Sequence, residues 1–141
     1  FGTTNNRDLP VRVVNGNIGH TITIAKTKTT ISSSVNGNYS QWAGINNFYF
    51  GPNLNVSKAF VENALRITMG TSYNQVLSNS TKTNELFNHR LAMNYSPKFR
   101  NKKIGKVGMT LSASYLQKIK TNAGSNAFSE FTGNFGINYN F

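Results

Sequence analysis

The residues that could carry catalysis are few and widely separated along the chain. The histidines are His20 and His89, and the acidic residues are Asp8, Glu62, Glu85 and Glu130. A hydrolase needs a nucleophile, a base and an orienting group within hydrogen-bond reach, and no spacing here indicates such a set. No pair of histidine and carboxylate recurs at ligand spacing, and there is no cysteine. We therefore expect no enzyme, no metal site and no cofactor.

Basic residues dominate the charge, with 15 Lys and Arg against 4 Asp and Glu, a formal net charge of +11. They are densest in residues 100–106, which contain Arg100, Lys102, Lys103 and Lys106. Such a cluster can contact the phosphates of nucleic acid or of anionic lipid headgroups, or it can be a solvated hairpin turn. No aromatic residue is interleaved with the cations as a stacking platform for bases. We expect a turn, lipid headgroups as its contact, and no nucleic acid.

Apolar residues recur along the chain with a period of two, which predicts β-strands, rather than with the period of 3.6 of a helix. These strands must position the residues described above. In residues 107–115, apolar side chains occupy the odd positions and Gly, Thr or Ser the even ones, and the final stretch 131–141 repeats the pattern. The same alternation predicts about seven strands between residues 17 and 141, with Pro52 and Pro97 at a bulge or strand edge. Residues 1–16 show no sustained period and are expected to be loop or a short strand.

The connections predict an antiparallel meander. Three of them are short, at residues 25–29, 59–63 and 99–106. Three others are rich in Asn, Ser, Thr and Gly, at residues 42–47, 77–85 and 119–126.

Lipid is favoured over a dry core as the medium for the apolar positions. The predicted strands are about 10 to 14 residues long, whereas a tilted membrane strand needs ~9 to 11 and soluble strands usually have about 5 or 6. Small polar residues with little charge form the opposite face, as in a barrel lumen. Aromatic residues fall at two rims, as the bilayer interface selects. One rim holds Tyr39, Phe48, Tyr73, Phe87, Tyr115 and Phe131; the other holds Phe60, Tyr95, Phe99, Tyr139 and Phe141.

The last strand carries the most specific signal, with Gly133, Phe135, Ile137, Tyr139 and a terminal Phe141 alternating along it. It resembles the terminal recognition strand of Gram-negative outer-membrane β-barrel proteins. The resemblance implies an outer-membrane location and recognition of Phe135, Ile137, Tyr139 and Phe141 by the barrel-assembly machinery. It also implies an orientation, with residues 77–85 and 119–126 as outer loops and 99–106 as an inner turn.

Four basic residues share the polar phase of their strands: Arg66, Arg90, Lys98 and Lys118. Facing a lumen, they would bias a pore toward anions or an acidic substrate. Alternatively, they hydrogen-bond to inner loops or a plug.

The fold expected is an all-β, transmembrane antiparallel β-barrel meander of about seven or eight strands. Single-chain bacterial barrels have even strand numbers, so either residues 9–14 supply an eighth strand or the chain is the C-terminal part of a larger barrel. We favour the larger barrel, whose wall would line a transport or secretion channel among further strands or subunits. The alternatives are a small non-conducting barrel that anchors partners, and a soluble basic β-sandwich that binds polyanions.

Overall fold

The computed structural model describes residues 11–97, 106–121 and 126–140, and this part of the chain is built from β-strands. Seven strands follow one another: β1 (Arg12–Ile24), β2 (Thr29–Trp42), β3 (Ile45–Phe60), β4 (Leu65–Ser78), β5 (Thr81–Tyr95), β6 (Lys106–Lys118) and β7 (Phe128–Asn140). Two short 3₁₀ turns, Ala25–Thr27 and Val61–Asn63, connect β1 to β2 and β3 to β4. None of the described helices is long and apolar enough to cross a membrane.

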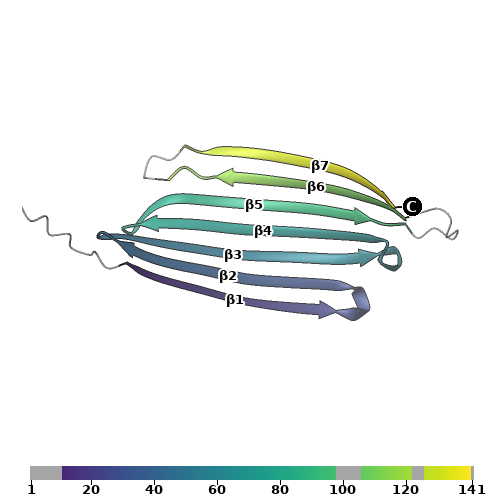
Figure 1. The fold of residues 1–141 in the computed structure, drawn as a ribbon, viewed down its shortest axis with the longest axis horizontal. Coiled ribbons are helices and arrows are strands. Elements are labelled where there is room, and N and C mark those ends of the chain that lie inside the picture. The colour runs from purple at the N-terminus through teal and green to yellow at the C-terminus, as the bar shows by residue number, and fades with distance from the viewer. Residues whose placement is uncertain (1–10, 98–105, 122–125, 141) are drawn as a thin grey trace, which may run out of the picture.

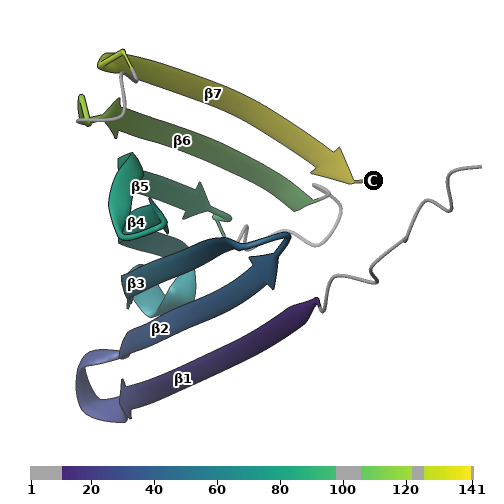
Figure 2. The same ribbon diagram turned by 90° about the vertical axis from the view of Figure 1, so that its left-hand side faces the viewer.

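The strands form one sheet in chain order, and each is antiparallel to its neighbour (Figure 1). This confirms the expected all-β meander. Within the described residues β1 and β7 pair on one side only, so the sheet is open rather than closed into a barrel. The sheet curves as well as twists: in Figure 2, β1 to β3 lie at the bottom, β4 and β5 at the left, and β6 and β7 at the top.

The strand pairing keeps the apolar positions of all seven strands on one face. One cross-strand row joins Ile24, Thr29, Lys58, Ile67, Met93, Leu111 and Phe135. The row one residue along joins Thr23, Thr30, Ser57, Thr68, Ala92, Ser112 and Asn134. Because neighbouring residues of a strand point to opposite faces, the sheet has one predominantly apolar face and one predominantly polar face.

The ends of the strands are staggered across the sheet. The row that begins at Ile24, the last residue of β1, reaches Phe135 in β7, and β7 continues to Asn140. At the other end, β2 extends to Trp42, whereas β6 stops at Lys118. Both ends therefore shift in the same direction, as they do when strands are tilted in a barrel wall.

Two connections that were expected to be polar loops are tight turns. β2 and β3 are joined by Ala43 and Gly44, with φ of 51° and 79°, and β4 and β5 by Asn79 and Ser80, with φ of 48° and 65°. Positive φ at both central residues is typical of the type I′ hairpin turn, whose twist matches that of the strands. The prediction of loops over 42–47 and 77–85 was therefore wrong, because Asn, Ser and Thr there belong to the strands.

The beginning of the first strand also differs from expectation. β1 starts at Arg12, so Asn15 and Gly16, which belong to the stretch 1–16 expected as loop or a short strand, continue the same long strand as Asn17. These three residues pair in register with Asn38, Gly37 and Asn36 of β2. Pairing with a neighbour overrides the low intrinsic β-propensity of Asn and Gly.

Pro52 interrupts strand pairing without forming a bulge, and Pro97 falls just past the end of a strand. The β3–β4 pairing passes from Phe50 to Asn53 and omits Gly51 and Pro52, with no change of register. Pro97 lies beyond Tyr95, the last residue of β5.

Candidate functional site

The polar face is the less exposed of the two faces in the central strands. In β6 the even positions from Gly108 to Lys118 are half-buried, whereas Met109, Leu111, Tyr115 and Gln117 are exposed. In β3 the polar-face residues at odd positions from Asn47 to Ala59 are half-buried or buried, although most of their side chains are small. This is the pattern expected if the polar face lies on the inner side of the curved sheet.

Hydrogen bonds between side chains cover the polar face. Tyr49 donates to Asn74 across the point where the β3–β4 pairing is interrupted, and Asn38 donates to Asn15. The Tyr49 ring lies over the buried Gly51, since a methyl group added there would be 2.6 Å from Tyr49 Oη. Tyr49 was not among the predicted site residues. The available signal was Tyr-Phe-Gly at 49–51, which places an aromatic ring beside a glycine on one face of the strand.

The described basic residues of the predicted lumen set lie on the polar face in different surroundings. Arg66 is exposed near one end of the sheet, in the row of Ala59 and Asn94. Arg90 is exposed in the middle of β5. Lys118 is half-buried, and its Nζ lies 5.9 Å from the centre of the Phe128 ring.

Other predicted site residues lie outside the described part of the chain: Lys98, Phe99, Arg100, Lys102, Lys103 and Phe141. Lys106 is the first residue of β6, and its side chain is also outside the described part.

One predicted aromatic rim is built from cross-strand pairs beside the hairpin ends. Tyr39 pairs with Phe48, and Tyr115 with Phe131. Tyr73 pairs with Phe87, and their ring centroids are 4.7 Å apart.

At the opposite rim the aromatic residues alternate with aliphatic ones. Phe60 and Tyr95 flank Leu65 in one row, and Tyr139 pairs with Val107.

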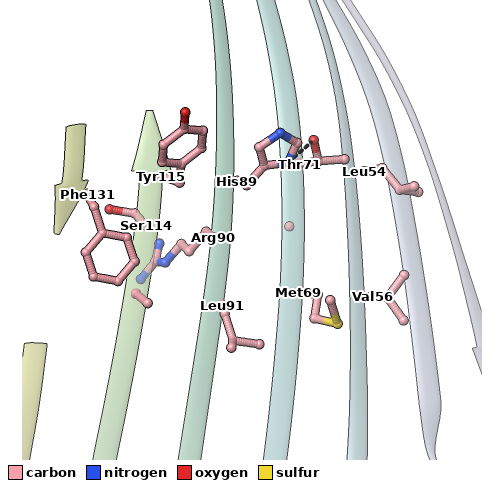
Figure 3. Close-up of a pocket in the computed structure, with 12 residues that line it drawn as sticks. Leu54, Val56, Met69, Thr71, His89, Arg90, Leu91, Ser114, Tyr115 and Phe131 are labelled. Atoms are coloured by element: carbon pink, nitrogen blue, oxygen red, sulfur yellow. Dashed lines mark hydrogen bonds between the residues drawn. The ribbon is translucent and has the colours of Figure 1, made fainter. Parts of the chain in front are cut away.

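A shallow groove crosses the apolar face above β3 to β7 (Figure 3). Its volume is about 550 Å³. The lining includes Leu54, Val56, Met69, Leu91, Tyr115 and Phe131. Among these apolar groups, His89 Nδ1 lies 3.0 Å from Thr71 Oγ1, so each has a hydrogen-bond partner. We interpret His89 as a satisfied polar residue rather than as a base.

Lys58 is a charged residue on the apolar face. It lies near one end of β3, and its Nζ is 5.1 Å from the centre of the Phe60 ring. A lysine stem can pack on apolar surface while its ammonium reaches the interface, which fits a position beside the rim aromatic Phe60.

The histidines and carboxylates of the described strands lie apart from one another on the sheet. His20 and His89 occupy the same cross-strand row, but β2, β3 and β4 separate them. Glu85 accepts a hydrogen bond of 2.7 Å from Tyr73 and forms an ion pair of 3.2 Å with Lys82, beside a tight turn. Within the described ranges no group of three His, Asp or Glu side chains could hold a metal ion.

No protein-family model, curated protein or solved structure matches this chain.

Proposed function

We propose that the seven strands are part of the wall of an outer-membrane β-barrel, which lines a transport or secretion channel in a Gram-negative envelope. One observation carries the proposal. The alternation stays in register across every strand pair, so the sheet has one predominantly apolar face and one face of mostly small polar residues, and in the central strands the polar face is the less exposed of the two. A transmembrane barrel needs this division between lipid and lumen.

The height of the apolar face supports a bilayer as its partner. Apolar side chains extend over residues 65–73 in β4, 87–95 in β5, 107–115 in β6 and 131–139 in β7. Each stretch has about nine residues, close to the ~9–11 that a tilted strand needs to cross the hydrocarbon. At ~3.3 Å per residue and a tilt of ~45°, this corresponds to roughly 21 Å, near the ~25 Å apolar band of such barrels. Aromatic residues limit the band at both rims.

The two edge strands support a larger barrel. β1 and β7 each have 13 residues and contain neither proline nor lysine, the residues that commonly protect exposed edges. In an antiparallel meander of seven strands, β1 and β7 run in the same direction. They cannot pair with each other in an antiparallel way, so an all-antiparallel barrel needs further strands between them.

Site-directed spin labelling of the full chain in lipid tests the membrane assignment. Labels at Ile67, Leu91, Leu111 and Ile137 should be accessible to oxygen and shielded from water-soluble relaxers. Labels at the polar-face control positions Thr68, Ala92 and Ser112 should show the reverse. Water accessibility at the first set would refute the lipid-facing surface. Shielding of that set from both oxygen and water would indicate a dry core, as in the β-sandwich alternative.

Ion conductance in a planar bilayer separates the two membrane functions. A channel wall should give conductance once its barrel is complete, and Arg66, Arg90, Lys98 and Lys118 should favour anions. A folded, inserted barrel without conductance would instead indicate an anchor or interaction module.

Deletion of Phe141 tests the assembly signal. One terminal ring contributes at most about 1.5–3 kcal/mol of apolar burial, whereas recognition by an assembly factor can depend on that side chain. The deletion should therefore lower the inserted amount in cells far more than it lowers stability in detergent. Normal insertion would leave Phe141 as an ordinary strand end.

A further inference from the structure

A small polar hollow lies on the polar face where β5, β6 and β7 meet. Its volume is about 260 Å³, and its lining is Asn88, Arg90, Ser112, Ala113, Ser114 and Asn134. The size suits a small ion rather than a drug-sized molecule, whose pockets usually exceed about 300 Å³. Hydroxyl, amide and guanidinium groups around such a hollow can all donate hydrogen bonds.

Arg90 is the charged group of this hollow. Its guanidinium makes no ion pair or hydrogen bond with any residue in the described ranges. On the β4 side, Asn55 covers the paired Gly70, because a methyl group at Gly70 would collide with Asn55 Oδ1. On the other side Arg90 extends across β6 toward Ser114 (Figure 3), its direct pairing partner. The guanidinium thus extends toward Ser114 on β6 and not over β4.

Among the described strand residues, the carboxylate on the same face as Arg90 belongs to Glu130. It lies in the row of Asn88 and Leu116, beside the row of Arg90, and two strands away on β7. The exposed Glu130 Oε1 accepts a hydrogen bond of 3.5 Å from Thr132. Arg90 therefore has no described acidic partner, and its positive charge is available to a bound anion.

We propose that this hollow binds a small oxyanion, a carboxylate or phosphate group. The planar guanidinium of Arg90 binds two oxygens of the anion side by side. The hydroxyls of Ser112 and Ser114 and the amide of Asn134 donate to the remaining oxygens. A role for this site in binding an anion during its passage through a channel rests on the proposed function. The ability of the site to bind an anion does not.

The other described cations of the polar face lack this arrangement. Arg66 is exposed, and its direct cross-strand partners are Ala59 and Asn94 rather than a serine. The ammonium of Lys118 already lies over the Phe128 ring. Arg66 is therefore a matched control, since it carries the same side chain and charge on the same face.

Anion titration of the full chain in detergent micelles, followed by NMR at constant ionic strength, tests the site. Inorganic phosphate should shift the backbone amide of Ser114 and the side-chain amide of Asn134 in a saturable way. Arg90→Gln should weaken this binding by about tenfold or more, because a charge-assisted bidentate contact is lost. Arg66→Gln should leave it within about twofold, since its charge lies outside the hollow and is screened.

Two further variants keep the result interpretable. Arg90→Lys retains the charge and the fold but not the planar fork, so binding should be weakened to an intermediate degree. Glu130→Gln removes the nearby negative charge and should strengthen binding. Repeating the titration with succinate distinguishes the two sources of the oxyanion, since tighter binding of succinate identifies a carboxylate ligand and tighter binding of phosphate a phosphate ligand.

The outcomes separate this proposal from the proposed function. No saturable shift with either anion, or equal weakening by Arg66→Gln and Arg90→Gln, would overturn the site and leave the membrane assignment standing. Saturable binding that depends on Arg90, together with water-accessible spin labels on the apolar face, would retain the site and refute the barrel.

Discussion

Two adjacent cross-strand rows of the same strands differ in residue type and in the face of the sheet on which they lie. Ile67, Met93, Leu111 and Phe135 lie on one face, and Leu111 and Phe135 are 46% and 67% exposed. One residue along, Thr68, Ala92, Ser112 and Asn134 lie on the other face, and the first three are half-buried. Leu111 is thus more exposed than the smaller, polar Ser112 beside it, whereas Ile67 and Met93 are half-buried like Thr68 and Ala92. Register keeps the faces apart, because a slip of one residue would exchange them.

The largest expected effect comes from placing one charge in each row. Leu111→Arg should destabilise the folded protein in lipid by roughly 2–4 kcal/mol, because an arginine would face the middle of the hydrocarbon. Ser112→Arg should cost much less, since its side chain would join the polar face. Reversible unfolding in urea from lipid vesicles measures both. Equal costs at the two sites would remove the contrast between the faces.

A smaller effect tests whether the polar face is packed as well as polar. A methyl group at Gly51 would lie 2.6 Å from Tyr49 Oη and 2.9 Å from Asn74 Oδ1, so it must separate this hydrogen-bonded pair. Gly51→Ala should destabilise by about 1–3 kcal/mol. At Gly136, on the same face, nothing lies within 4 Å of the added methyl. Gly136→Ala should be neutral or stabilise by at most about 1 kcal/mol. The same unfolding measurement ranks the two, and equal costs would mean that the Tyr49 ring does not cover Gly51 in solution.

The smallest expected effect concerns the rim of the apolar face. Tyr73 and Phe87 should show a favourable coupling of about 0.5–1.5 kcal/mol in a double-mutant cycle that replaces each with leucine. The hydrogen-bonded pair of Thr68 and Ser57 on the polar face provides the comparison, with about 0.2–1 kcal/mol expected. Coupling near zero between Tyr73 and Phe87 would mean that the rings serve the membrane interface separately.

Hydrophobic alternation was sufficient to predict the strands but not their ends. A side chain facing a polar lining and a residue in a loop are drawn from the same set, chiefly Asn, Ser, Thr and Gly. Composition therefore could not distinguish Asn79-Ser80, which is a turn, from Thr81, Thr83 and Asn84, which are strand residues. Whether such a residue lies in a strand or in a turn depends on its pairing with the neighbouring strand. The hydrophobic pattern of one strand does not contain this information.

The same limit applies to the hollow around Arg90. Its phase on the strand was predictable from alternation, since Arg90 lies between His89 and Leu91. Its surroundings were not, because Ser114 and Asn134 come from strands whose register was unknown. Likewise, the small size of Gly51 could be read from the sequence, but the hydrogen bond between Tyr49 and Asn74 that covers it depends on the β3–β4 pairing.

The strands have the same order in the sheet as in the chain, and this affects how the protein folds. Each described strand pairs only with the strand before it and the strand after it. The described turns close loops of few residues, so forming a hairpin there costs little chain entropy. Low separation between paired residues favours rapid folding. Any hairpin closed by a described turn can therefore form first and serve as a template for the next strand. Folding that began at the β4–β5 hairpin could add strands in both directions without rearranging any pair already made.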